Sequence, residues 1–140
     1  MTYPDILIVG AGVAGLSLAT ALGREGFRVT VIDGAKRPSA PTADRAVADW
    51  DLRVSALTPV SIAFLERLGA WSAIRARRTG CYTGMKVWDG HGSGRIGFDA
   101  SEVNAPYLGH IFENRRKPPA LLQCADTRPG VVVLWVCALG

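Results

Sequence analysis

The stretch Ile6–Asp33, ILIVGAGVAGLSLATALGREGFRVTVID, decides the fold of this chain. Its apolar run Ile6–Val9 ends at a glycine, which is typical of a fully buried parallel strand. A helix is expected from Val13 to about Glu25, because Gly26 then follows in the position that commonly ends helices. Val29–Ile32 is expected to form a second strand. The order strand, glycine turn, helix, strand predicts an α/β fold built on a βαβ unit.

Within the expected helix, the spacing of apolar residues suggests which side is buried. Leu18 and Leu22 lie four residues apart, and Ala14 falls on the same face. This spacing is typical of the apolar stripe of an amphipathic helix. We therefore expect these three residues to share the apolar face of the helix.

The turn between the first strand and the helix has the spacing G-x-G-x-x-G. Its six positions are Gly10, Ala11, Gly12, Val13, Ala14 and Gly15. Gly10 allows a tight turn, Gly12 lets the backbone approach a pyrophosphate, and Gly15 lets the helix pack close to the strand. The helix N-terminus adds free N–H groups and about half a positive charge. These six residues are the predicted phosphate-binding turn of a dinucleotide site.

Asp33 comes 18 residues after Gly15, at the end of the second strand. An acid at about this spacing accepts hydrogen bonds from ribose hydroxyls. An acid also disfavours a 2′-phosphate, so the sequence predicts FAD or NAD rather than NADP. A βαβ unit with a glycine-rich turn and no ligand is the structural alternative.

Charge and cysteine content limit the other functions. The 140-residue chain has a net charge of +4, with basic clusters at 75–78 and 115–117. Such clusters are usually solvated surface, with attraction to an anionic cofactor or membrane as the alternative. No nucleic-acid-binding motif accompanies them. Three widely spaced cysteines fit a reducing cytosol rather than a disulfide framework. Histidines 91 and 110 lack partners at metal-ligand spacing, so no metal site is expected.

The middle of the chain predicts a loop followed by helices. Residues 34–51 have no clear period, and they read as a long loop. Thr58 followed by Pro59 predicts the start of a helix that ends at Gly69. Its apolar contacts are expected from Ile62, Leu65 and Leu68. A further short helix is expected over 71–78. The four tryptophans (Trp50, Trp71, Trp88 and Trp135) are expected to be packing residues rather than base-stacking platforms.

The last third predicts strands and one more helix. Residues 85–87 and 95–98 alternate around Asp89-Gly90-His91-Gly92, which favours an antiparallel hairpin. A strand is expected over 107–112. A helix is expected to start just after Pro118-Pro119 and to continue to Arg128. Residues 131–136 are expected to form a late strand.

Four blocks of this sequence resemble one enzyme family. They are the glycine turn, residues 51–59 with 64–71 (DLRVSALTP and FLERLGAW), residues 85–89 (MKVWD), and residues 108–115 (LGHIFENR). In this order they are similar to the ubiquinone-biosynthesis hydroxylases, which are FAD-dependent aromatic monooxygenases of the p-hydroxybenzoate hydroxylase type. The resemblance covers roughly residues 4–115 of the chain.

The resemblance implies a cofactor site and a reaction. The glycine turn and Asp33 would hold the ADP part of FAD, and Arg53 would contact its phosphate region. Asn114 and Arg115 would reach the cofactor from the other side. The family uses NAD(P)H as electron donor, and it hydroxylates an aromatic polyprenyl phenol. The resemblance implies no catalytic side chain among these residues, because in this family the cofactor performs the redox reaction.

The resemblance also implies a division of the chain and a setting. Residues 1–80 would form the FAD-binding part, residues 81–113 a β-rich part of the substrate domain, and residues 114–140 a divergent return to the first part. Family members are more than twice as long, so the family fold would be incomplete here. A cytoplasmic location is expected, with contact to the inner membrane or to a ubiquinone-biosynthesis complex left open. An NAD-linked Rossmann oxidoreductase and a non-catalytic remnant are the alternatives.

Overall fold

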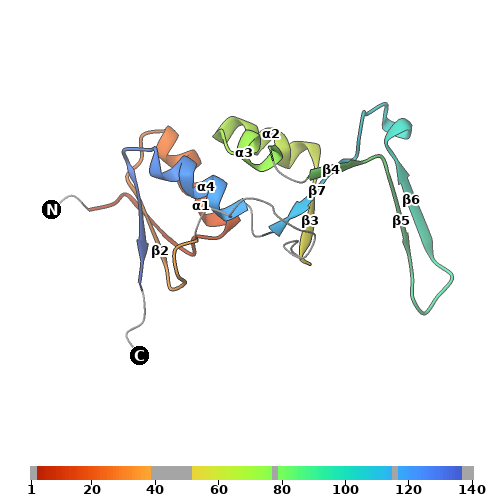
Figure 1. Cartoon of the computed structure of the whole chain (residues 1–140), viewed down its shortest axis with the longest axis horizontal. Coiled ribbons are helices and arrows are strands. Elements are labelled where there is room, and N and C mark those ends of the chain that lie inside the picture. Colours follow the sequence, from red (N-terminus) through yellow and green to blue (C-terminus); the bar gives the residue numbers. More distant parts are fainter. Residues whose placement is uncertain (1–2, 39–51, 77–78, 115–116, 137–140) are drawn as a thin grey trace.

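A computed structural model describes residues 3–38, 52–76, 79–114 and 117–136 of the chain. Figure 1 shows the arrangement of its helices and strands. In chain order they are β1 (Ile6–Val9), α1 (Val13–Arg24), β2 (Val29–Asp33), β3 (Val54–Leu57), α2 (Pro59–Leu68), α3 (Trp71–Arg75), β4 (Thr79–Tyr82), β5 (Gly84–Trp88), β6 (Arg95–Asp99), a 3-10 turn η2 (Ala100–Val103), β7 (Gly109–Glu113), α4 (Lys117–Asp126) and β8 (Val131–Trp135).

The predicted βαβ unit is confirmed, and it lies in a parallel sheet of order β1-β2-β8. Helices α1 and α4 pack against each other and against this sheet. Their buried side chains Leu16, Ala19, Leu121 and Ala125 share one core with Val31 of β2. The late strand expected over 131–136 is therefore the third strand of the sheet, in register with β2. No helix within the described ranges is long and apolar enough to cross a membrane.

The buried face of α1 differs from the predicted one. The buried positions are Leu16, Ser17, Ala19 and Thr20. By contrast, the side chain of Leu18 is 49% exposed. Helix α1 packs against β2 and also against α4. A single apolar stripe, which is typical of a helix that packs against one surface, therefore does not describe its buried side. The hydroxyl of Thr20 is satisfied within the helix, where it donates to the carbonyl oxygen of Leu16 at 2.7 Å.

A second sheet is antiparallel and has the order β3-β7-β4. The helix predicted before it is confirmed: Thr58 caps α2, Pro59 opens it, and Gly69 closes it with a φ of 84°. Ile62, Leu65 and Leu68 are buried as expected. The strands β3 and β4 have no counterpart among the strands that the sequence predicts.

Several predicted boundaries need correction. Helix α3 ends at Arg75, before the expected 78. Strand β7 begins at Gly109 rather than at 107. Helix α4 begins at Lys117, before the two prolines, and it ends at Asp126 rather than at 128. Prolines are tolerated in a first helical turn, because the N–H groups there have no helical partner.

The predicted hairpin is confirmed as β5 and β6, which project at one end of the molecule (Figure 1). Trp88 of this hairpin is 70% exposed, so the expectation that it is a packing residue is wrong. Trp71 is buried as expected, and Trp135 is partly buried against the core. Trp50 and most of the loop expected over 34–51 lie outside the described residues.

Candidate functional site

The glycine turn has the backbone geometry that its spacing predicts. Gly10 has a φ of 106°, a region that side chains disfavour. Its N–H donates to the carbonyl oxygen of Ile32 at 2.8 Å, which ties the turn to the end of β2. A Cβ added at Gly15 would lie 1.9 Å from the carbonyl oxygen of Gly10, whereas one added at Gly12 would meet no atom within 4 Å. Gly15 therefore serves close packing, and Gly12 leaves open space above the turn.

The start of α1 offers uncapped backbone donors. Gly12 occupies the N-cap position, and no side chain caps this end of the helix. The N–H of Leu16 donates to the carbonyl oxygen of Gly12 at 3.0 Å, so the N–H groups of residues 13–15 precede the first helical hydrogen bond. Such groups, together with the helix dipole, favour an anion at this position.

Asp33 lies against the turn, a contact that the sequence analysis did not predict. Its Oδ2 accepts a hydrogen bond from the N–H of Ala11 at 2.6 Å, and its Oδ1 accepts one from the N–H of Ala35 at 2.7 Å. These two bonds, with the one from Ala35 contributing more, lower the pKa of the Asp33 carboxyl below its usual value of 3.8. The carboxylate is therefore negative at neutral pH, and it orders both the turn and the segment after β2.

A shallow hollow of about 260 Å³ adjoins this carboxylate. Its walls are Val9, Gly10, Ile32, Asp33, Gly34 and Val136. Pockets for small ligands usually measure about 300–1,000 Å³. The hollow is thus large enough for part of a nucleotide, and a whole dinucleotide would extend beyond it.

Arg53 and Asn114 come together at one end of the second sheet. The backbone N–H of Asn114 donates to the carbonyl oxygen of Arg53 at 2.9 Å. The hydroxyl of Ser55 donates to Oδ1 of Asn114 at 2.5 Å, which leaves the amide nitrogen of Asn114 directed elsewhere. Ser55 was not singled out from the sequence, and its place two residues after Arg53 in the resembling block is the only signal that pointed to it. Arg115 lies outside the described residues.

The predicted site residues thus form two groups. Ala11 and Asp33 are in direct contact at the glycine turn, and Arg53 and Asn114 are joined at the end of β3 and β7. The chain leads from Asn114 into α4, which packs against α1. The two groups are therefore linked through the pair of helices that covers the parallel sheet.

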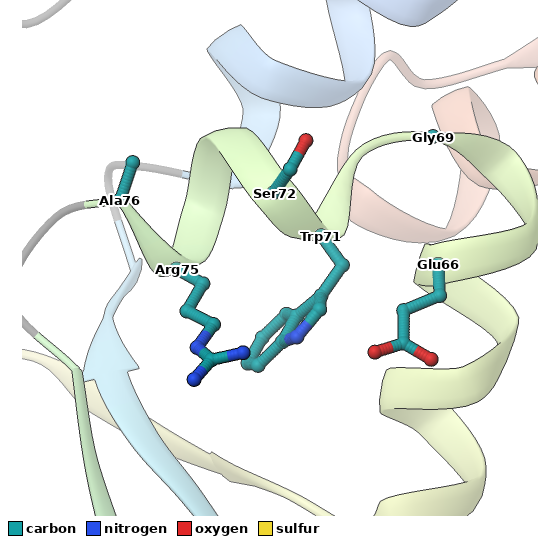
Figure 2. Close-up of a pocket in the computed structure, with 6 residues that line it drawn as sticks. All are labelled: Glu66, Gly69, Trp71, Ser72, Arg75 and Ala76. Carbon is teal, nitrogen blue, oxygen red and sulfur yellow. The ribbon is translucent and has the colours of Figure 1, made fainter.

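A larger hollow of about 520 Å³ lies over α2 and α3, and none of the predicted site residues lines it. Figure 2 shows the side chains of Glu66 and Arg75 on either side of the Trp71 indole. Trp71 contacts the ring of His110 edge-on, with the ring centres 5.4 Å apart, and Tyr107 contacts that ring at 4.9 Å. His110 is therefore an aromatic packing residue. Within the described part of the chain, no three His, Cys, Asp or Glu side chains are grouped to hold a metal ion.

Comparison with known proteins gives consistent matches in sequence and fold. The profile of the NAD(P)-binding Rossmann-like domain matches residues 8–68. The 3-demethoxyubiquinol 3-hydroxylase of Escherichia coli is 36% identical over 92% of this chain and 32% of its own length. The ubiquinone hydroxylase UbiL of Rhodospirillum rubrum is 32% identical over 93% of this chain and 29% of its own length.

The similarity extends to solved structures. The structure of PqsL from Pseudomonas aeruginosa, a probable FAD-dependent monooxygenase, superposes on 96% of this chain with a TM-score of 0.70. The identity is 24%, so this match shows the fold alone, and it covers 33% of the PqsL chain. The chain thus spans about a third of the length of the relatives that it matches.

Proposed function

We propose that this chain, which is similar to the 3-demethoxyubiquinol 3-hydroxylase of Escherichia coli and to UbiL, binds the ADP part of FAD at its glycine turn. The observation that carries the proposal is the contact between Asp33 and Ala11, which places a carboxylate beside the uncapped start of α1. A dinucleotide site needs these two groups together, one for the ribose and one for the pyrophosphate.

Each residue of the turn would have a defined part in binding. Gly12 leaves open space where a pyrophosphate would approach the backbone. The N–H groups at the start of α1 would donate to phosphate oxygens. A carboxylate has about four lone-pair sites. Asp33 can therefore accept hydrogen bonds from ribose hydroxyls while it still accepts those from the N–H groups of Ala11 and Ala35.

Arg53 and Asn114, at the end of β3 and β7, would contact the same cofactor. The guanidinium of Arg53 suits a phosphate, since it offers several donors in a planar fork. Because Oδ1 of Asn114 is engaged by Ser55, the amide N–H groups of Asn114 remain for an acceptor on the cofactor. Arg115 would add a second positive charge at this end. Bound FAD would supply the redox chemistry, while the protein binds and orients it and excludes water.

The activity of the whole protein is also a proposal. We infer that the protein to which this sequence corresponds uses NAD(P)H to hydroxylate an aromatic polyprenyl phenol. The division into residues 1–80, 81–113 and 114–140, a cytoplasmic location, and contact with the inner membrane or a biosynthetic complex belong to the same proposal. The names of the relatives support the substrate class, since they act on ubiquinol precursors or ubiquinone.

The test is a binding titration of the purified chain with FAD, ADP and NAD, each followed by isothermal titration calorimetry, with flavin absorbance and fluorescence as a second readout for FAD. We expect FAD and ADP to bind with comparable dissociation constants, because the ADP part makes the contacts. Binding of NAD that is tighter than that of FAD would favour the NAD-linked oxidoreductase, with which the profile match at residues 8–68 is compatible. Absence of binding by all three ligands would favour the non-catalytic remnant.

A further inference from the structure

Ser55 lies on the same face of the second sheet as two of the proposed cofactor-binding residues. The register pairs Ser55 with Phe112. The backbone N–H of Asn114 donates to the carbonyl oxygen of Arg53, which continues this register beyond the ends of β3 and β7. Side chains two residues apart along a strand point to one face, and those of paired residues do the same. The side chains of Arg53, Ser55 and Asn114 therefore project on one side of the sheet.

A short hydrogen bond joins two of these side chains. The hydroxyl oxygen of Ser55 lies 2.5 Å from Oδ1 of Asn114. Bonds of the O–H···O type measure about 2.5–3.0 Å and those of the N–H···O type about 2.7–3.2 Å, so this distance fits the amide oxygen rather than the nitrogen. Because Oδ1 carries no hydrogen, the hydroxyl is the donor. The amide nitrogen of Asn114 therefore points away from Ser55.

The orientation of the Asn114 amide decides what this side chain offers to a ligand. Rotation of the amide by half a turn exchanges its oxygen, which accepts hydrogen bonds, with its nitrogen, which donates them. With Oδ1 on Ser55, the N–H groups remain for an acceptor such as a phosphate oxygen. In the opposite orientation Oδ1 would face that acceptor, and two oxygens without a hydrogen between them would repel each other.

Two further features limit the freedom of Asn114. Its backbone is held by the 2.9 Å hydrogen bond to Arg53, so rotation of the side chain is the main freedom left. Both Ser55 and Asn114 are half-buried, so water competes less for their hydrogen bond than it would at an exposed site. The N–H groups of Asn114 are therefore oriented in the free chain, before any ligand binds.

We propose that Ser55 is a positioning residue of the cofactor site. Its hydroxyl holds Oδ1 of Asn114, so that the amide meets a phosphate oxygen of FAD with its N–H groups. Such preorganisation increases affinity, because binding does not then have to order the side chain. The inference rests on the proposed function, and it adds the residue that determines whether Asn114 meets the cofactor as a donor or as an acceptor.

The test compares FAD binding by serine variants of the whole chain, measured by isothermal titration calorimetry. Ser55→Ala should raise the dissociation constant by at least about twofold, which is the loss expected if the two amide orientations become equally populated. Ser55→Thr keeps the hydroxyl on a residue that suits a strand, and it should bind FAD as the wild type does. Ser101→Ala is the matched control and should leave binding unchanged, since the Ser101 hydroxyl also donates to a side-chain oxygen, that of Asp99 at 2.6 Å, but at the base of the hairpin.

A double-mutant cycle separates positioning from a purely structural role of Ser55. Asn114→Ala removes the N–H donors and should weaken FAD binding by about tenfold, since hydrogen bonds to charged groups are strong. In this background Ser55→Ala should have no further effect on the dissociation constant, because the amide that Ser55 orients is gone. Circular dichroism checks that all variants fold.

NMR relaxation of the side-chain amide of Asn114 gives a second readout, which needs neither FAD nor a variant. Asn104, which is exposed, provides the reference in the same chain. We expect the Asn114 amide to be ordered in the free wild-type chain and the Asn104 amide to be mobile.

Three results would overturn the inference. One is an Asn114 amide as mobile as that of Asn104. Another is FAD binding by Ser55→Ala that equals binding by the wild type. The third is an effect of Ser55→Ala that persists in full in the Asn114→Ala background. The last two results leave the proposed function standing, whereas failure of the wild-type chain to bind FAD would contradict the proposed function and this inference with it.

Discussion

The carboxylate of Asp33 accepts a hydrogen bond of 2.6 Å from the backbone N–H of Ala11, which lies 22 residues earlier in the sequence. The same side chain accepts the N–H of Ala35 at 2.7 Å through its other oxygen. One side chain at the end of β2 thus fixes the glycine turn before α1 and the segment that follows β2. The geometry of the turn therefore depends on this carboxylate before any ligand arrives.

Replacement of Asp33 should weaken cofactor binding. We expect Asp33→Ala to raise the dissociation constant for FAD by at least about tenfold, because it removes a charged acceptor for the ribose and releases Ala11. The measurement is the FAD titration described above. Asp99→Ala is the matched control, since Asp99 also accepts a backbone N–H, that of Ser101, but at the base of the hairpin. An equal effect of both substitutions would show that the role of Asp33 is not local to the turn.

Two glycines of the turn should separate folding from binding. Gly15→Ala should destabilise the chain by about 1–3 kcal/mol, because its Cβ would overlap the carbonyl oxygen of Gly10. Gly12→Ala should leave the free energy of unfolding nearly unchanged, since its Cβ would meet no protein atom within 4 Å. It should nevertheless weaken FAD binding, because the methyl group occupies the space through which a pyrophosphate approaches.

Chemical denaturation measures the free energy of unfolding of both variants, and FAD titration measures cofactor binding by Gly12→Ala. The wild-type chain is the reference for both. If Gly12→Ala bound FAD as tightly as the wild type, the cofactor would not approach the turn at this residue. If Gly15→Ala were as stable as the wild type, the helix would have moved away from Gly10 to admit the methyl group.

Local chemistry made part of the fold predictable from sequence. The turn at Gly10, the capping of α2 by Thr58, and its closure at Gly69 depend on neighbouring residues alone. These features were predicted correctly, because each is set by backbone geometry or by a hydrogen bond within a few residues. The spacing of a βαβ unit placed Asp33 at the end of β2, whereas its hydrogen bond with Ala11 was not predicted.

Contacts between distant segments were not predictable in the same way. Strands β3 and β4 are four residues each, and both pair with β7, which lies about 30 to 55 residues further along the chain. The buried side of α1 is set by α4, about 100 residues away in sequence, which is why Leu18 was assigned to the wrong face. The pairing of Ser55 with Asn114 likewise depends on the register of β3 with β7.

Two leucines of α1 provide a test of the observed packing. Leu16 is fully buried, so Leu16→Ala should destabilise the chain by about 2–5 kcal/mol, through lost apolar burial and the cavity left behind. Leu18→Ala on the same helix should have a much smaller effect, because its side chain is 49% exposed. Both variants keep a good helix former, so helix propensity favours neither. Urea denaturation of both proteins measures the difference, and a larger loss for Leu18→Ala would contradict the packing of α1.

The ion pair between Asp5 and Arg28 should make stability depend on acid pH. Oδ1 of Asp5 lies 2.6 Å from Nη2 of Arg28, and its Oδ2 accepts the backbone N–H of Arg28 at 2.9 Å. The side-chain hydrogen bond from Arg28, followed by the backbone one, lowers the pKa of Asp5 from 3.8 to about 2. Because the pKa in the folded chain is lower than in the unfolded chain, the stabilisation is present above 3.8 and is lost as pH falls toward about 2.

The variant Asp5→Asn should therefore be less stable than the wild type near neutral pH, and its disadvantage should shrink as pH falls from about 4 to about 2. The effect should be modest, because both side chains are partly exposed to solvent. Thermal unfolding of the two proteins over this range provides the measurement, with added salt as a check on the ionic contribution. A difference that stays constant across the range would show that Asp5 stabilises the start of β1 through its neutral hydrogen bonds alone.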